Sequence, residues 1–135
     1  MTQMMKLSTE DGHTLDAAVA GDPSTAHGGV VVLQEIFGLN AHIRSLPERF
    51  AEAGYYAVAP ALFDRAERGI ELGYDTDGRE LGIALKNAVD DDAIFDVTAA
   101  ISAAAAAGPR ATTAWADTAA AAHPPPCRAR IRLGD

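Results

Sequence analysis

The 135-residue sequence has little of several residue types, and each shortage excludes a class of protein. Its one cysteine, Cys127, cannot form an internal disulfide, which excludes a disulfide-stapled secreted domain. Only 11 Lys and Arg stand against 19 Asp and Glu, and the net charge of -8 disfavours binding to nucleic acid. A membrane span needs about 20 apolar residues, and no apolar run in the sequence approaches that length. Residues 1–10 also lack the apolar core of a signal peptide. We therefore expect a soluble, cytoplasmic protein that does not bind membranes.

The composition changes abruptly near residue 108. Residues 1–108 carry 17 acidic and 7 basic residues, whereas residues 109–135 carry 2 acidic residues and 4 arginines. Four of the seven prolines lie in the last stretch, whose large aliphatic residues are Ile131 and Leu133 alone. Such a segment buries too little apolar surface to offset the entropy of ordering it. We predict one domain over residues 1–108 and a disordered, low-complexity tail over residues 109–135.

Strands are predicted at four places in residues 1–60. Residues 5–9 and 14–20 flank an Asp-Gly pair, which is typical of a β-hairpin. Residues 29–34 form a continuous valine-rich run, and residues 55–59 form a second apolar run that Pro60 ends. Runs without alternation fit strands that are buried on both faces of a parallel sheet. The fold class that this pattern predicts is α/β.

The helix between the last two strands has two candidate starts. Its apolar stripe is Ile43, Leu46, Phe50 and Ala53, and Gly54 ends it. Ser45 and Glu48 form the pattern of a capping box, which predicts a start at Ser45 with Pro47 in the first turn. A start at Asn40 stays open, although it would place Pro47 inside the helix.

Two further helices are predicted before the tail. One covers residues 79–88. The other begins at three aspartates, residues 90–92, whose charges favour the positive end of the helix dipole. The apolar face predicted for this second helix is Ile94, Val97, Ile101 and Ala105. An α/β pattern requires a third parallel strand next, and the sequence after Gly108 gives no signal for one.

Glu35 is the best candidate for a functional residue on position alone. It directly follows the buried run 29–34, and ligands of open α/β sheets gather beyond the carboxyl ends of strands. A carboxylate there is costly to desolvate unless it has a partner. The alternative is an exposed loop acid or a cap for the next helix, and position alone leaves both open.

Other chemical patterns are weak. The four histidines are scattered, with no two at ligand spacing on one helix, so we expect no metal site and no cofactor. None of the serines, nor Cys127, lies in a Gly-x-Ser-x-Gly or Gly-x-Cys-x-Gly turn. Cys127 follows three prolines and is interpreted as incidental.

Two neighbouring stretches carry a family resemblance. Residues 29–44 read Gly-Val-Val-Val-Leu-Gln-Glu-Ile-Phe-Gly-Leu-Asn-Ala-His-Ile-Arg, and residues 50–60 read Phe-Ala-Glu-Ala-Gly-Tyr-Tyr-Ala-Val-Ala-Pro. This order of strand, Gln-Glu-Ile-Phe-Gly-Leu-Asn, helix, Gly-Tyr, strand and Pro resembles the dienelactone hydrolase family. Residues 67–74 and the helix that ends at Gly108 also fit, so the resemblance covers residues 5–108.

The resemblance implies the N-terminal strands and helices of an α/β-hydrolase fold, a three-layer sandwich. It implies cleavage of a small-molecule lactone or carboxylic ester, in which a cysteine or serine attacks the acyl carbon with a histidine as base and an aspartate orienting it. By resemblance, Glu35 controls the ionisation of that nucleophile, and the backbone N–H of Ile36 contributes to the oxyanion hole. Some members bind the substrate carboxylate with an arginine, for which Arg68 and Arg79 are candidates.

The chain departs from this family after Gly108. The family continues with a valine-rich strand and a Gly-Tyr-Cys-x-Gly-Gly nucleophile turn, whereas this chain continues Pro-Arg-Ala-Thr-Thr-Ala-Trp-Ala-Asp into a proline tract. Ala, Arg, Pro, Gly and Thr dominate when GC-rich DNA is read out of frame, so our hypothesis is a frameshift or premature end near Gly108. For the tail of residues 109–135, a linker to a lost or cleaved partner is the alternative to disorder. We expect the chain as given to be truncated before its nucleophile and inactive on esters.

Two functions from different classes stay open. The first is an enzyme of this family, represented by its N-terminal half with part of the active site. The second is a non-catalytic small α/β domain that acts as a binding or interaction module with a flexible basic tail. The sequence fixes neither the natural substrate nor the oligomeric state.

Overall fold

A five-stranded sheet forms the centre of the computed structural model, which describes residues 2–107 and 113–115. The strands are β1 (Gln3–Ser8), β2 (Thr14–Ala20), β3 (Gly29–Val32), β4 (Tyr56–Pro60) and β5 (Thr113–Trp115), in the order β1-β2-β4-β3-β5. β2 is antiparallel to both β1 and β4, and β3 is parallel to both β4 and β5. The predicted α/β fold, with its hairpin and its parallel pair, is confirmed.

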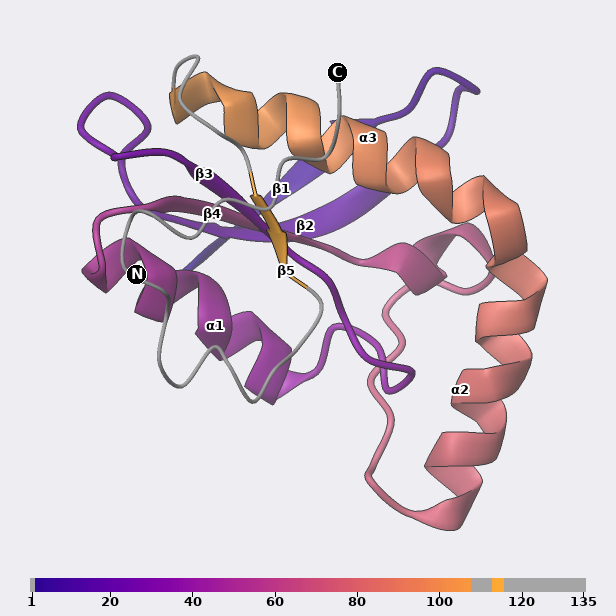
Figure 1. Cartoon of the computed structure of the whole chain (residues 1–135). Helices are drawn as coiled ribbons and strands as arrows, with labels where there is room; N and C mark the ends of the chain where they lie inside the picture. Colours follow the sequence, from indigo (N-terminus) through magenta and orange to yellow (C-terminus); the bar gives the residue numbers. More distant parts are fainter. Residues whose placement is uncertain (1, 108–112, 116–135) are drawn as a thin grey trace.

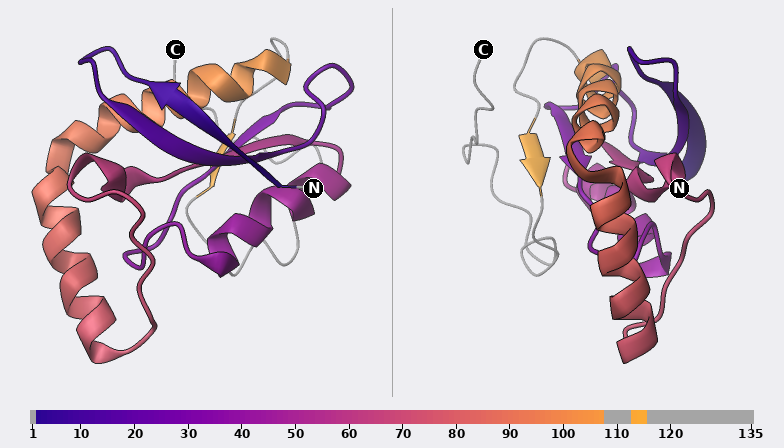
Figure 2. Two further views of the ribbon diagram at one scale, coloured as in Figure 1. Left: turned by 180° about the vertical axis from the view of Figure 1, so that it is seen from behind. Right: turned by 90° about the vertical axis from the view of Figure 1, so that its right-hand side faces the viewer.

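Helices cover both faces of this sheet, as Figures 1 and 2 show. α1 (Ala41–Glu52) packs on Val30 and Val32, whereas α3 (Ala93–Ala104) packs on Val31 and Val58 of the other face. Side chains of a strand point alternately to the two faces, so a strand between two helices must be apolar throughout. All four residues of β3 are buried, which explains its unbroken valine run.

α2 (Thr76–Val89) extends away from the sheet beyond the end of β4 (Figure 1). Phe63 lies in the short 3₁₀ turn η1 (Leu62–Arg65), and it packs against Leu85 and Val89 to form a separate small core. α2 begins three residues earlier than the predicted range 79–88, because Asp75 caps it by accepting from the backbone N–H of Gly78. Two more 3₁₀ turns, η2 (Asp90–Asp92) and η3 (Ala105–Ala107), flank α3.

The start of α1 corrects the prediction of a cap at Ser45. Asn40 is the N-cap, and its Oδ1 accepts a hydrogen bond of 3.0 Å from the N–H of Ile43. The Ser45 hydroxyl instead donates to the carbonyl of His42. Pro47 therefore lies inside the helix, where it lacks the usual N–H donor. Its ring is fully buried in the core, and this burial offsets the lost bond.

The buried face of α3 also differs from the predicted one. Asp96, Ala100 and Ala104 are buried, whereas Ile94 is 61% exposed. The close approach of the helix to the sheet explains the small residues, because a Cβ added at Gly29 would lie 2.3 Å from the carbonyl oxygen of Ala104. An aspartate was not expected on this face, since a charge is buried only when it is paired.

β5 overturns the expectation that no third parallel strand follows α3. Val30 pairs with Thr113 and Val32 pairs with Trp115, so β5 lies along the outer edge of β3. A strand of three residues is too short to show a hydrophobic period, so no pattern in the sequence predicted it. The other residues of the predicted disordered tail, 109–112 and 116–135, lie outside the described residues.

Arg65 connects three distant parts of the chain. Its Nη2 and Nε donate to the two carboxylate oxygens of Asp96 at 2.9 and 3.2 Å, and its Nη1 donates to Asp11 in the turn between β1 and β2 at 2.6 Å. Asp96 is completely buried. The hydrogen bond from Arg65, followed by that from Thr9, holds the pKa of Asp11 well below its usual range. The hydrogen bonds to Asp11 and Asp96 raise the pKa of Arg65.

Replacing the N-cap of α1 tests the observed helix start. Asn40→Ala removes the acceptor for the N–H of Ile43, so we expect the free energy of unfolding to fall by about 1 kcal/mol. Ser45→Ala is the matched control and should change it by no more than a few tenths of a kcal/mol. Urea unfolding of both variants measures the difference. A larger loss of unfolding free energy for Ser45→Ala than for Asn40→Ala would support Ser45 as the N-cap of α1.

The pKa of Asp11 predicts a loss of stability in acid. Because its folded-state pKa is lowered, the bond to Arg65 stabilises the fold above the unfolded pKa of about 3.9, and this contribution disappears as the pH falls below that value. Asp11→Asn should flatten the decline in unfolding free energy between about pH 4 and pH 2. Asp91→Asn, an exposed aspartate outside this network, is the control. An unchanged decline in Asp11→Asn would contradict the assignment.

Candidate active site

The segment 34–40 follows β3 and forms a loop at the carboxyl end of the parallel strands. The side-chain oxygen of Gln34 accepts a hydrogen bond of 2.9 Å from the N–H of Leu62, two residues after β4 ends. Its amide nitrogen donates to the carbonyl of Glu35 at 3.2 Å. Gln34 thus joins the ends of two neighbouring strands. This edge is where ligands of open α/β sheets bind.

Glu35 and Ile36 are half-buried in this loop, and α2 lies directly against it. A Cβ added at Gly82 of α2 would stand only 1.9 Å from the carbonyl oxygen of Ile36. Only glycine permits this approach of helix to loop. The Glu35–Ile36 backbone is therefore held from the side of α2.

The segment 70–74 holds the same loop at its far end. Gly38 and Glu71 form an antiparallel bridge, and the N–H of Leu72 donates to the carbonyl of Phe37 at 2.9 Å. The rings of Phe37 and Tyr74 meet edge to face, with centroids 4.6 Å apart. Gly38 has a φ of 81°, a conformation that glycine adopts without strain. The loop is consequently fixed between α2 and the segment 70–74.

The two predicted arginines occupy different surroundings. The Nη2 of Arg68 donates to the carbonyl and hydroxyl of Thr14 at 2.6 and 3.2 Å, so its guanidinium is engaged with β2. Arg79 is exposed on α2, three residues before Gly82. Residues three apart share one face of a helix. Arg79 therefore lies one turn from Gly82, at the exposed edge of the buried face of α2.

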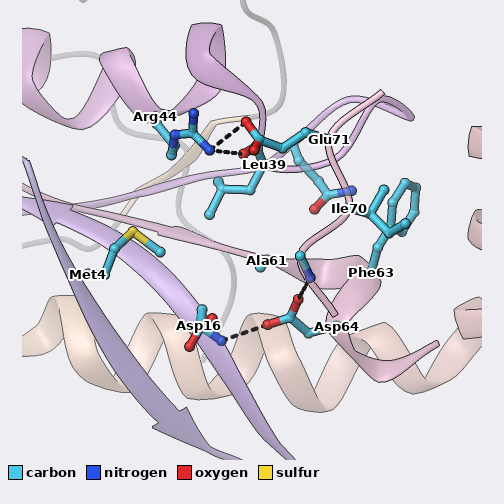
Figure 3. Close-up of a pocket in the computed structure, with 11 residues that line it drawn as sticks. Met4, Asp16, Leu39, Arg44, Ala61, Phe63, Asp64, Ile70 and Glu71 are labelled. Atoms are coloured by element: carbon cyan, nitrogen blue, oxygen red, sulfur yellow. Dashed lines mark hydrogen bonds and ion pairs between the residues drawn. The ribbon is translucent and has the colours of Figure 1, made fainter. Parts of the chain in front are cut away.

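A cavity of about 330 Å³ opens beside the loop on the α1 side (Figure 3). Gln34 contributes to its wall, and so do Arg44 and the buried Asp64, two residues that sequence reasoning missed. Asp64 follows β4 as Glu35 follows β3, so the rule that selected Glu35 could also have found it. Arg44 forms an ion pair of 2.5 Å with Glu71, a contact that has no local sequence signal.

In residues 2–107 and 113–115, no group of three or more His, Cys, Asp or Glu side chains is placed to hold a metal ion. No helix in these ranges is both long enough and apolar enough to cross a bilayer.

Comparisons with known proteins agree with this geometry. The sequence pattern of the dienelactone hydrolase family matches residues 15–114, which includes β5 as far as Ala114. Carboxymethylenebutenolidase from Pseudomonas putida is 38% identical over 104 residues, which make up 75% of this chain and 44% of the relative. A Synechocystis protein assigned the same activity is 52% identical over 58 residues, or 43% of this chain and 24% of the relative.

Solved structures show the same relationship. A protein from Klebsiella pneumoniae assigned to the dienelactone hydrolases superposes with a TM-score of 0.58 at 31% identity, over 78% of this chain and 44% of its own. The strand order and the site at the carboxyl edge define the N-terminal part of an α/β hydrolase. Within that class, the chain belongs to the dienelactone hydrolase family. It spans less than half the length of the relatives named above.

A substitution at Gly82 tests how α2 holds the loop. Gly82→Ala should destabilise the protein by about 1–3 kcal/mol, because the new Cβ meets backbone, even though alanine favours helices over glycine by about 1 kcal/mol. Amide chemical shifts of Ile36 and Phe37 should move with it. Gly73→Ala is the control, since its Cβ would meet nothing closer than 3.6 Å. Stabilisation by Gly82→Ala would show that α2 does not press on Ile36.

Proposed function

We propose that this chain provides the N-terminal half of the active site of an enzyme that cleaves a small lactone or carboxylic ester by nucleophilic acyl transfer. The observation that carries the proposal is the loop 34–40 at the carboxyl edge of β3, fixed between α2 and the segment 70–74. An acyl-transfer site needs hydrogen-bond donors that are already in place before charge develops. A loop held on both sides meets that need.

The role proposed for Glu35 follows from the neighbouring strands. β5 is parallel to β3 and adjacent to it, and neighbouring strands lie about 4.8 Å apart. A nucleophile that follows this strand in a whole member of the family therefore emerges beside the loop of Glu35. There the carboxylate influences the ionisation of the nucleophile, and the N–H of Ile36 donates to the oxyanion that forms on the substrate.

Arg79 is the proposed ligand of a substrate carboxylate. It lies one helical turn before the contact between Gly82 and Ile36, whereas the guanidinium of Arg68 is bonded to Thr14. A guanidinium binds a carboxylate through two parallel hydrogen bonds, which fixes the orientation of the substrate as well as its affinity. This arrangement favours a substrate that carries an acid group next to its lactone or ester.

The chain by itself is proposed to be inactive. Its sequence holds no Gly-x-Ser-x-Gly or Gly-x-Cys-x-Gly turn, the strained turn that exposes the nucleophile in α/β hydrolases. If this chain joined to the missing sequence of a whole family member also fails to hydrolyse esters, a non-catalytic binding module is the remaining hypothesis.

A chimera tests the function directly. Residues 113–135 are replaced by the corresponding strand, nucleophile turn and remaining sequence of the Pseudomonas putida relative, which is 38% identical over the matched part. We expect the chimera to hydrolyse p-nitrophenyl acetate and a carboxylate-bearing lactone, and the original chain to hydrolyse neither. A folded chimera without activity would overturn the proposal.

Two substitutions in the chimera assign the roles. Glu35→Gln should lower kcat about 100-fold, with Glu52→Gln, an exposed glutamate of α1, as the control. Arg79→Met should raise KM about 10-fold for the carboxylate-bearing lactone and leave that for p-nitrophenyl acetate unchanged. Arg49→Met, on the exposed side of α1, is the matched control. Equal effects on both substrates would remove Arg79 from the substrate-binding role.

A further inference from the structure

The cavity beside the loop is separate from the site of Glu35. Val30 and Val32 belong to the core on the α1 side, whereas Val31 belongs to the core on the α3 side. Gln34 continues the first of these two series, and it lines the cavity. Glu35 and Ile36 are not among the described residues that form its wall. The cavity consequently shares Gln34 and Leu39 with the loop 34–40, but its wall does not include the groups assigned to acyl transfer.

Its wall combines an apolar middle with charged groups at both ends (Figure 3). The middle is formed by Met4, Leu39, Ala61, Phe63 and Ile70. The ion pair between Arg44 and Glu71 lies at one end, and Asp64 lies at the other next to Asp16. At about 330 Å³ the cavity falls in the size range of small-molecule sites, which are mainly apolar with a few polar groups.

Asp64 determines which ligand chemistry the cavity accepts. Its side chain is only 3% exposed, and its two oxygens accept single hydrogen bonds from the N–H groups of Asp16 (2.9 Å) and Gly69 (3.2 Å). Its cationic neighbour, Arg68, is half-exposed and 3.8 Å away, so water screens this pair. A carboxylate has about four acceptor positions, which leaves positions on Asp64 that only a donor can fill.

The other charged groups around the cavity also favour a cationic ligand. Three carboxylates and one guanidinium line it, and Lys6, which pairs with Asp16, is largely exposed. An anionic ligand would compete with Glu71 for Arg44, and it would have no hydrogen-bond donor to offer to Asp64. The net charge of -8 on the whole chain also attracts cations.

We propose that this cavity binds a small amine, an apolar body of aralkyl size that carries one ammonium group. The ammonium donates to Asp64, and the apolar body lies between Leu39, Ala61 and Phe63. The proposal does not depend on the hydrolase function, because it uses none of Glu35, Ile36 and Arg79, the groups assigned to acyl transfer.

Three probes of the same shape test the charge preference on the full chain. Titration calorimetry and amide chemical shifts are measured with 2-phenylethylamine, 2-phenylethanol and 3-phenylpropionate. We expect the amine to bind about tenfold more tightly than the alcohol, and the carboxylate to bind least. Amide shifts should centre on Asp16 and Gly69, whose N–H groups bond to Asp64. Tighter binding of the carboxylate, or no saturation by the amine up to about 10 mM, would overturn the proposal.

Substitutions locate the binding in the cavity. Ala61→Leu fills its middle and should abolish amine binding. Glu71→Gln leaves the charge of Arg44 uncompensated and should weaken amine binding about threefold, and this variant keeps the test valid if Ala61→Leu does not fold. Glu67→Gln, an exposed glutamate outside the cavity wall, is the control and should bind as the unmodified chain does. Unchanged affinity in both Ala61→Leu and Glu71→Gln would place the binding elsewhere.

Discussion

The buried pair of Asp96 and Arg65 is the constraint on which the arrangement of the elements depends. Asp96 is completely buried on α3, and a buried charge that loses its partner costs about 3–5 kcal/mol. Arg65 belongs to η1, and the N–H of Leu62 in the same turn holds Gln34 at the start of the candidate loop. The ion pair therefore fixes α3 on the sheet and, through η1, the end of β3. It also reaches Asp11, which ties the β1–β2 turn to the same point.

Local sequence was sufficient for the elements whose stability is local. The Asp-Gly turn predicted the hairpin, and the two unbroken apolar runs predicted β3 and β4 as a parallel pair. Prediction failed where tertiary packing overrides local preference. Pro47 argued against a helix start at Asn40, yet the burial of its ring outweighs the missing hydrogen bond. Asp96 occupies the buried face of α3 because of Arg65, 31 residues away, which no helical period reveals.

The candidate site was predictable only in part, and for the same reason. Glu35 was selected as a candidate because it follows a strand that the sequence alone predicts to be buried. The segment 70–74 comes from a stretch with little periodicity, Gly82 comes from the predicted helix 79–88, and both reach the loop only in the folded chain. A glycine in a helix has several explanations in a sequence, and only the 1.9 Å approach to Ile36 selects one. A position at the end of a strand identifies a candidate residue from sequence alone. The contacts that hold its loop in place form only in the folded chain.

The sheet order explains how an active site of this fold is shared between distant parts of a chain. β3 lies between β4 and β5, so the loop after β3 has the end of one parallel strand on either side. On the β4 side, the bond from Leu62 to Gln34 and the contacts of the segment 70–74 fix the loop. On the β5 side, three residue pairs set the register. The loop 34–40 is therefore positioned from the β4 side by contacts within the first 107 residues, while β5 pairs with β3 on the other side. The support of the loop 34–40 and the pairing of β5 are therefore physically separate contributions to this edge of the sheet.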